Sequence, residues 1–270
     1  MKKLFIIKIG GNVIDDENQL SSFLNDFSSM SGNKILVHGG GKIATEIMKQ
    51  LGIEPKMIDG RRITDADTLK MVQMVYGGLI NKNIVAQLQS KHCNAIGLTG
   101  ADANLILATK RAVLSLSGEG GWDKYVDFGF VGDISKVNSE KLSTLLNSGF
   151  SPVIAPLTHD GKGQILNTNA DTIASAISVA MAKTTEVNLI YCFEKPGVLK
   201  NVEDDNSVIE KINSSDYEKY KTEGIILKGM IPKLDNAFEA IKQGVKSVVI
   251  CQAKDLQKII ANQKTGTRLE

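Results

Sequence analysis

The chain has 270 residues, 42% of them hydrophobic, and its 32 basic and 30 acidic residues leave a formal net charge of +2. This length and apolar content suit one large domain or two closely joined lobes. The near balance of charge argues against a nucleic-acid partner, which usually meets a strongly basic face. The three cysteines form no CxxC pair, so they indicate neither a zinc site nor a disulfide framework, and we expect a reducing, cytoplasmic setting.

The N-terminal segment predicts a buried strand. Lys2 and Lys3 precede four apolar residues, and Lys8 then interrupts the run. A secretory signal core needs roughly seven to fifteen apolar residues, and a membrane span needs roughly 20. No stretch of the chain approaches the second length, so we expect no membrane partner.

Short apolar runs alternate with longer amphipathic segments along the rest of the chain. The runs lack polar alternation, which is typical of central parallel strands covered on both faces. The alternation predicts an α/β sandwich with a largely parallel sheet. The expected strands lie at residues 4–9, 35–38, 95–98, 153–155, 187–191 and 245–250.

Two helical patterns follow the second predicted strand, at about 42–51 and about 65–90. Thr64 and Asp67 have the spacing of a capping box at the start of the second helix. Gly77 and Gly78 lie in its middle, where glycine weakens a helix, so they indicate a kink or a close subunit contact.

Residues 104–135 differ from this pattern and predict strands or hairpins that form a flap. They contain the apolar stretch 113–116 and then the glycine-rich stretch 117–121. Further along, residues 160–163 read Asp-Gly-Lys-Gly and predict a turn. A boundary between two lobes is expected near residues 160–170.

A lysine and two glycines follow the first predicted strand. Lys8 stands at the end of that strand, and Gly10 and Gly11 come next. Ligands of open α/β sheets bind at the carboxyl ends of the strands. Glycines there let the backbone approach a bulky anion and offer N–H donors, so the segment indicates an anion site. An ordinary glycine turn is the alternative.

A second glycine-rich segment, His38-Gly39-Gly40-Gly41-Lys42, lies between a predicted strand and a predicted helix. Consecutive glycines before a helix N-terminus make an anion cradle. The segment is not a Walker A loop, because GxxxxGK[ST] is absent.

The same segment raises a rival function, a nicotinamide-dinucleotide-binding oxidoreductase that uses the Gly39 to Gly41 loop. Gly39, Gly41 and Ala44 satisfy G-x-G-x-x-A, and Asp59 lies at a plausible spacing for a ribose contact. Against this reading, the motif follows the second strand and leaves the Lys8 segment unexplained.

Asn167, Asn169 and Asp171 open a very apolar helix. Capping and the helix dipole explain one of these side chains. Three amide or acid side chains around one helix start exceed what capping requires, so they indicate a polar site.

Two basic residues are further candidates. Pro232 suits the start of a helix and places Lys233 in the first turn, where the dipole disfavours a cation by about 0.3–1 kcal/mol. Lys233 therefore indicates a bound anion, with an exposed lysine as the alternative. Arg62 is a candidate clamp for a carboxylate, with a surface arginine as the alternative. The three histidines are scattered and suggest neither a catalytic triad nor a metal site.

In order and spacing, these segments resemble the amino acid kinase superfamily, and within it the acetylglutamate kinases, over essentially the whole chain. The resemblance implies a three-layer αβα sandwich with a central, mainly parallel sheet. The motifs that carry it are Ile7-Lys8-Ile9-Gly10-Gly11, Val37-His38-Gly39-Gly40-Gly41, Gly60-Arg61-Arg62-Ile63-Thr64, Asn167-Thr168-Asn169-Ala170-Asp171, Gly229-Met230-Ile231-Pro232-Lys233 and Gly266-Thr267-Arg268.

The resemblance also implies a reaction. The γ-phosphoryl group of ATP passes to the side-chain carboxylate of N-acetyl-L-glutamate, or of N-succinyl-L-glutamate, to give an acyl phosphate in arginine biosynthesis. Mg²⁺ is bound mainly through the phosphates, and no dedicated protein metal site is expected. Another amino acid kinase activity is the alternative. Residues 117–128 lie where the family has a hairpin near the substrate, so they bear on the acyl group.

The resemblance implies roles for individual residues. Lys8 and Lys233 hold the phosphoryl group, and Asp171 orients both. The substrate is bound by Gly10, Gly11, Gly40, Gly41, Arg62, Asn167 and Asn169, with Arg62 and Asn167 on its α-carboxylate. The nucleotide is bound by Glu194, Lys195, Gly197, Ile225, Leu227, Lys228 and Gly229, with Glu194 near the place of the aspartate usual in the family.

The resemblance finally implies an assembly. The chain begins at its first strand, which matches the arginine-insensitive members. We expect a homodimer joined through the long helix after Thr64. A lobe of about 1–165 binds the acyl-glutamate and dimerises, and a lobe of about 166–270 binds the nucleotide.

Overall fold

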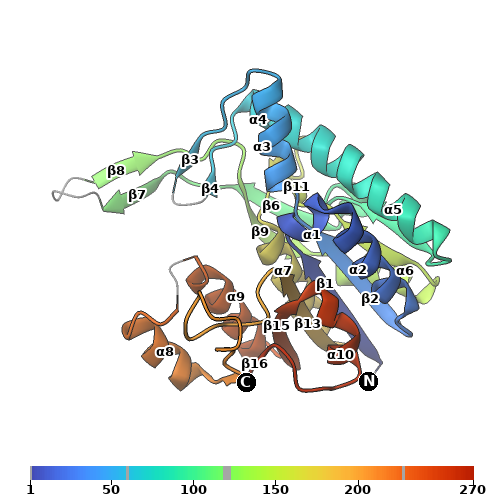
Figure 1. The fold of residues 1–270 in the computed structure, drawn as a ribbon. Helices are drawn as coiled ribbons and strands as arrows, with labels where there is room; N and C mark the ends of the chain where they lie inside the picture. Colours follow the sequence, from blue (N-terminus) through green and yellow to red (C-terminus); the bar gives the residue numbers. More distant parts are fainter. Residues whose placement is uncertain (1, 59–60, 118–122, 227–228) are drawn as a thin grey trace.

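The computed structural model describes residues 2–58, 61–117, 123–226 and 229–270 (Figure 1). Their main sheet has eight strands in the order β14-β16-β15-β13-β1-β2-β10-β5. Neighbouring strands run parallel, apart from the antiparallel pair β15–β16. The strands are β1 Lys3–Ile9, β2 Asn33–His38, β5 Ala95–Leu98, β10 Ser151–Ile154, β13 Glu186–Phe193, β14 Lys211–Ile212, β15 Ser247–Gln252 and β16 Thr267–Leu269. All six strands expected from the apolar runs are confirmed.

The central sheet is buried on both faces, and β1 shows why its sequence lacks polar alternation. Ile7 and Ile9 belong to one apolar core, and Leu4 and Ile6 belong to the other. All four are fully buried. Alternate side chains of a strand point to opposite faces, so the two pairs enter the cores on the two sides of the sheet. A strand covered on both sides therefore needs apolar residues at every position.

Helices on the two faces complete a three-layer αβα sandwich, as predicted. In Figure 1, α1 Gly11–Asp15 and α2 lie in front of the sheet and α7 lies behind it. The first core takes side chains from α2 Glu17–Ser29, α3 Gly41–Gln50, α5 Asn81–Ser90 and α10 Leu256–Ile260. The second takes side chains from α6 Ser139–Asn147, α7 Ala170–Ala182, α8 Ser214–Thr222 and α9 Ile231–Lys242.

The helical pattern at about 65–90 forms three consecutive segments instead of one uniform helix. They are α4 Ala66–Val72, the π-helix η1 Gln73–Ile80 and α5. Gly77 and Gly78 lie in the π-helix, so the chain stays helical through the glycine pair with wider turns.

The predicted capping box at Thr64 and Asp67 is wrong. The helix begins one residue later than expected, and its N-cap is Asp65, whose side chain accepts a hydrogen bond of 2.9 Å from the Thr68 N–H group. Thr64 is fully buried, and its Oγ1 accepts a hydrogen bond of 3.0 Å from Asn167 Nδ2. A hydroxyl held by a distant amide does not serve as the helix cap.

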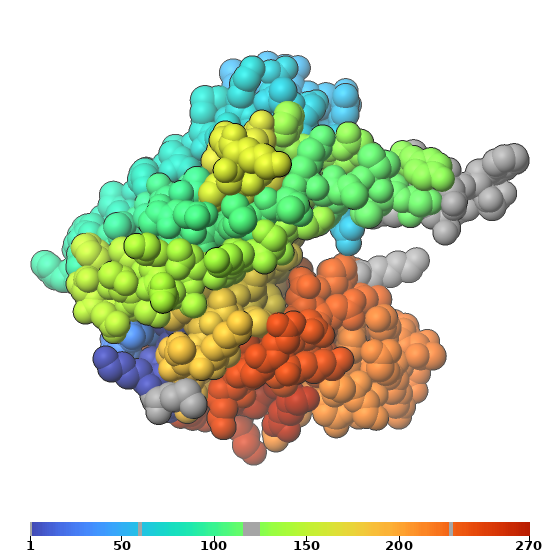
Figure 2. All heavy atoms as spheres, turned by 180° about the vertical axis from the view of Figure 1, so that it is seen from behind, coloured from blue at the N-terminus to red at the C-terminus, as the bar shows by residue number. Residues whose placement is uncertain are grey.

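The described residues between 104 and 135 form mainly strands, as predicted. A second sheet has the order β12-β11-β6-β9, and β7 and β8 pair as a hairpin that projects from the body of the molecule (Figure 1). Seen from behind, the surface is hollowed beneath this hairpin and above the orange region around α8 and α9 (Figure 2). The strands are β6 Ile106–Lys110, β7 Leu114–Ser117, β8 Asp123–Val126, β9 Gly132–Val137, β11 Leu157–His159 and β12 Ile165–Asn167; a short pair joins β3 Met57–Ile58 to β4 Arg61–Arg62.

The turn expected at residues 160–163 is confirmed between β11 and β12. Asp160 Oδ1 accepts hydrogen bonds from the N–H groups of Lys162 and Gln164. The main sheet continues across this point, because β1 pairs with β13. The division into two lobes there stays a prediction. In the described part of the chain, no helix is long and apolar enough to cross a membrane.

Candidate active site

The carboxyl ends of the central strands bring the glycine-rich segments to one edge of the sheet. Ile9, at the end of β1, lies opposite His38 of β2 and Cys192 of β13. The Gly39 N–H group donates a hydrogen bond of 3.0 Å to the Ile9 carbonyl and joins the first two loops. This is the edge at which open α/β sheets bind their ligands.

The helices that follow the glycines begin without side-chain caps. Gly40 is the N-cap of α3, with φ of 143°, and no side chain accepts a hydrogen bond from the first turn. This φ is strained for a residue with a Cβ atom, and a Cβ at Gly40 would also press on the Ile80 side chain, so the position favours glycine. Helix α9 also starts without a side-chain cap, at Met230. Such N–H groups, with the helix dipole, favour a bound anion.

Lys8 and Asp171 form a buried ion pair at this edge. Lys8 Nζ lies 2.7 Å from Asp171 Oδ1, and the two side chains are only 8% and 9% exposed. Asp171 stands in the first turn of α7, where the dipole favours a carboxylate. The hydroxyl of Tyr191 donates a hydrogen bond to the Asp171 carbonyl at 3.2 Å, which fixes α7 against β13. A buried lysine needs such a partner, because an unpaired buried charge is strongly destabilising.

Lys233 reaches the same place from the first turn of α9. Its Nζ lies 3.7 Å from the centroid of the Phe193 ring, and Lys8 Nζ lies 4.9 Å from that centroid. Burial lowers the pKa of the Lys233 amine most, and the Lys8 charge lowers it further; Asp171 and Glu194 oppose the shift. Two ammonium groups thus lie near one ring and one buried carboxylate, which leaves an excess of positive charge.

A cavity of about 300 Å³ opens beside these groups. Both lysines of the site line it, together with backbone from the first glycine loop and residues after β13. Its lining residues are Lys8, Gly10, Gly11, Asn12, Val13, Phe193, Glu194, Lys195, Gly197, Met230, Lys233 and Ile250. A small anionic group fits this combination of cations and exposed backbone.

Arg62 contacts the second glycine loop. Its Nη2 donates hydrogen bonds to the Gly41 carbonyl at 2.8 Å and to Thr45 Oγ1 at 2.7 Å. Its buried Nη1 has no hydrogen-bond partner among the described residues. A buried guanidinium nitrogen without a partner is costly, so it is suited to donate a hydrogen bond to a ligand oxygen.

The two asparagines at the start of α7 have different local roles. Asn169 is the N-cap, and its Oδ1 accepts hydrogen bonds from the N–H groups of Asp171 and Thr172. Asn167 donates its Nδ2 to Thr64, and its backbone N–H donates to the Phe130 carbonyl. The expectation that one of the three polar residues caps the helix is therefore confirmed.

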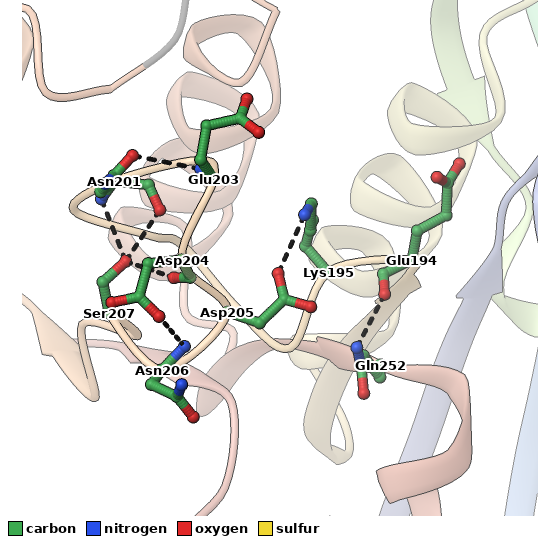
Figure 3. Close-up of polar contacts among 9 residues, drawn as sticks. All are labelled: Glu194, Lys195, Asn201, Glu203, Asp204, Asp205, Asn206, Ser207 and Gln252. Atoms are coloured by element: carbon green, nitrogen blue, oxygen red, sulfur yellow. Dashed lines mark hydrogen bonds and ion pairs between the residues drawn. The ribbon is translucent and has the colours of Figure 1, made fainter.

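The expected nucleotide residues are divided between the cavity and its surroundings. Glu194, Lys195 and Gly197 line the cavity. Figure 3 shows Lys195 turned toward Asp205, with Nζ 2.9 Å from Oδ1, and the Glu194 carbonyl accepting a hydrogen bond from Gln252 Nε2. Asp205 raises the pKa of the Lys195 amine through this contact.

Two of the remaining expected nucleotide residues, Ile225 and Gly229, are absent from the cavity lining. Ile225 packs against the second apolar core, and Gly229 has open space around it. Leu227 and Lys228 lie outside the described residues, as does Asp59 of the dinucleotide hypothesis.

Sequence reasoning missed three residues at the site. His38 was grouped with scattered histidines, although it directly precedes the glycines. Phe193 lies beside both lysines. Asp15, at the end of α1 Gly11–Asp15, lies 3.3 Å from Lys42 Nζ, and burial raises the pKa of its carboxyl. Only His38 had a sequence signal, its position beside the loop.

His38 is a neutral support for the glycine loop. It is fully buried, and its Nδ1 donates to the Gly39 carbonyl at 2.7 Å, since a carbonyl can only accept. Asn81 Nδ2 donates to His38 Nε2 at 3.1 Å and to the Val153 carbonyl at 3.0 Å. Burial lowers the pKa of the imidazole to about 4.

Solved structures with the same fold define the class of protein. The structure of smu.665 from Streptococcus mutans UA159 matches with a TM-score of 0.75 at 27% identity and covers 100% of this chain and 99% of that one. Giardia carbamate kinase matches with a TM-score of 0.68 at 15% identity, over 99% and 98% of the two chains. The family model described as "Amino acid kinase family" matches residues 3–252.

Proteins of similar sequence show to which group within this family the chain belongs. A Cytophaga hutchinsonii protein named acetylglutamate kinase is 61% identical over 270 residues, covering 100% of this chain and 99% of its own length. One from Bacteroides thetaiotaomicron, of the same name, is 53% identical over 269 residues, with 100% and 99% covered. The chain belongs to the acetylglutamate kinases of the amino acid kinase family. The oxidoreductase alternative is therefore not needed.

The neutral state of His38 makes stability depend on pH. In the unfolded chain, histidine takes up a proton below about pH 6.5, whereas the folded chain resists it down to about pH 4. As the pH falls through this window the unfolded state binds more protons, and this group lowers the free energy of unfolding by about 3 kcal/mol. Urea denaturation between pH 4.5 and pH 8 measures the slope.

The variant His38→Gln isolates this contribution. It removes the titrating group, so its stability should depend less on pH below 6.5 than that of the wild type. His92→Gln replaces an exposed histidine and should keep the wild-type slope. Parallel slopes for wild type and His38→Gln would show that His38 is not held neutral.

Proposed function

We propose that this protein transfers the γ-phosphoryl group of ATP to the side-chain carboxylate of N-acetyl-L-glutamate and forms an acyl phosphate for arginine biosynthesis. The observation that carries the proposal is the pairing of Lys8 with Asp171 beside Lys233, at a cavity lined by Gly10 and Gly11. The names of its similar relatives support the choice of acceptor.

The charges of the site suit this reaction. Lys8 and Lys233 exceed the single buried carboxylate of Asp171 by one positive charge, which a phosphoryl group in transfer would neutralise. Asp171 orients Lys8 by direct contact at 2.7 Å and acts on Lys233 through its charge. The acceptor carboxylate is ionised at neutral pH, so no general base is required.

The glycine loops and Arg62 suit the two substrates. The backbone of Gly10, Gly11, Gly40 and Gly41 offers N–H donors to phosphate and substrate oxygens. The unpartnered Nη1 of Arg62 supports a contact with the α-carboxylate. Asn167 and Asn169 would complete the acyl-glutamate site from the lobe boundary.

Mg²⁺ would enter with ATP, held mainly through its phosphates. The described residues contain no cluster of three or more His, Cys, Asp or Glu side chains suited to a metal. We assign the nucleotide to the lobe of about 166–270 and the acyl-glutamate to the lobe of about 1–165. The cavity lining supports Glu194, Lys195 and Gly197 as nucleotide contacts. We also assign Ile225, Leu227, Lys228 and Gly229 to the nucleotide, because they directly precede Met230 in the chain, and Met230 lines the same cavity.

A hydroxylamine trap tests the reaction, because acyl phosphates react to give coloured hydroxamates. The protein with MgATP should give strong signal with N-acetyl-L-glutamate and little with L-glutamate or L-aspartate. Preference for N-succinyl-L-glutamate would reassign the acyl group, and signal with a free amino acid alone would move the protein to another activity of the superfamily. Silence with all four acids would sink the proposal.

Lys8→Ala should lower kcat by about 10²–10³-fold. This estimate takes the lost ammonium as comparable to an oxyanion-hole donor, at roughly 2.7–4 kcal/mol of transition-state stabilisation. Lys211→Ala is the control, since Lys211 lies on the edge strand β14, away from the site and from the helix after Thr64, with its side chain 69% exposed. Near-normal turnover of Lys8→Ala would overturn the assignment of Lys8.

We also propose a homodimer formed through the helix that follows Thr64. Met74 and Leu79 of η1 are 58% and 45% exposed, and large apolar side chains exposed on one helix suit a covered interface. Light scattering should give twice the 29.2 kDa mass of the chain. A monomer or a hexamer would contradict this assembly.

A further inference from the structure

The ring of Phe193 lies beside both lysines of the site. It is the last residue of β13, and its ring lies 3.7 Å from Lys233 Nζ and 4.9 Å from Lys8 Nζ, measured to the centroid. A Cβ atom added at Gly10 would lie 3.8 Å from Cδ1 of Phe193, so the ring also borders the first glycine loop.

The ring is held by the elements that hold the ion pair. Residues 191 and 193 point to the same face of β13. Their rings stack with centroids 6.0 Å apart and planes 5° apart. Tyr191 is fully buried, and its hydroxyl donates to the carbonyl of Asp171, the partner of Lys8. The ring is therefore fixed in place before any ligand binds.

Lys233 depends on this ring more than Lys8 does. Lys8 has Asp171 at 2.7 Å, whereas no carboxylate oxygen of the described residues lies within 4.0 Å of Lys233 Nζ. The first turn of α9 also disfavours a cation at Lys233. The face of an aromatic ring attracts an ammonium group through its quadrupole, and more strongly where water is excluded.

The absence of net charge on the ring matters at a site for ATP. Glu194 acts on Lys233 through its charge from the same cavity lining, and a further carboxylate in direct contact with Lys233 would hold the ammonium but add to the repulsion of the triphosphate. An uncharged ring holds the ammonium group without repelling the triphosphate. It also accepts no hydrogen bond from the backbone N–H groups that phosphate oxygens would use.

We propose that Phe193 is a positioning residue for phosphoryl transfer: its ring holds the ammonium groups of Lys233 and Lys8 at the cavity without adding negative charge. This inference rests on the proposed function, which assigns the phosphoryl group to these lysines. Phe193 acts through them, by holding their ammonium groups at the cavity that it lines with them.

Fluorinated phenylalanines test the inference, because they weaken the negative face of the ring and keep its shape. Mono-, di- and trifluorophenylalanine at position 193 should lower kcat stepwise, by roughly tenfold across the series. The KM for N-acetyl-L-glutamate should stay unchanged. Phe193→Trp, with a stronger face, should retain activity, and Phe193→Leu should lose it. A flat kcat across the fluorinated series would overturn the inference.

A second readout does not depend on turnover. NMR of ¹³C-labelled lysine in the free protein follows the titration of Lys233. Weakening the ring disfavours the charged amine, so the pKa of Lys233 should fall along the series, while the charges that face it (Lys8, Asp171 and Glu194) stay the same. A constant pKa would overturn the inference.

The control is the same fluorinated series at Phe23, a fully buried ring that stacks on Phe27 in the first core. It should leave both kcat and the Lys233 titration unchanged. Equal effects at both positions would indicate a general loss of packing and overturn the role of Phe193. If the wild type forms no acyl phosphate, the proposed function fails, and the NMR series alone decides whether the ring holds Lys233.

Discussion

The ion pair between Lys8 and Asp171 is the contact on which the site depends. It joins the end of β1 to the first turn of α7, and both side chains are more than nine-tenths buried. Neither charge is stable there without the other. Their pairing fixes the position of α7 under the sheet, and the hydroxyl of Tyr191 ties the same turn to β13. The ends of the strands that carry the two glycine loops are thereby held next to the start of the helix that carries the polar residues.

The rest of the site is organised around surplus positive charge. Lys233 and Arg62 form no ion pair with a carboxylate among the described residues, and the helices α1, α3 and α9 at the site begin without side-chain caps. His38 lies directly beneath the second loop yet stays neutral, so it supports the Gly39 carbonyl without adding charge. Such an arrangement costs stability in the free protein and is relieved when an anion binds.

The location of Lys8 and of the glycines of both loops at one edge of the sheet was predictable from the sequence, because it depends only on their position at the ends of strands. A residue that ends a parallel strand must lie at the carboxyl edge of the sheet, whatever surrounds it. The competition between side chains for the same hydrogen-bond partner was harder to predict. Thr64 had the spacing of a helix cap, but Asn167 takes its hydroxyl, and Asp65 became the cap. The wider turns at Gly77 and Gly78 likewise depend on what packs against the helix.

The sequence by itself determined the α/β class, the six principal strands, the order of the glycine loops and the identity of Lys8, Lys233, Arg62 and Asp171 as candidates. These follow from apolar periodicity and from residue types at strand and helix ends, which are local properties. Only the tertiary structure decided that Asp171 contacts Lys8 directly but reaches Lys233 only through its charge, that His38 and Asn81 support a loop, and that Phe193 lies beside two lysines. These contacts join segments far apart in the chain. Their distances and burial exist only after the sheet has ordered its strands.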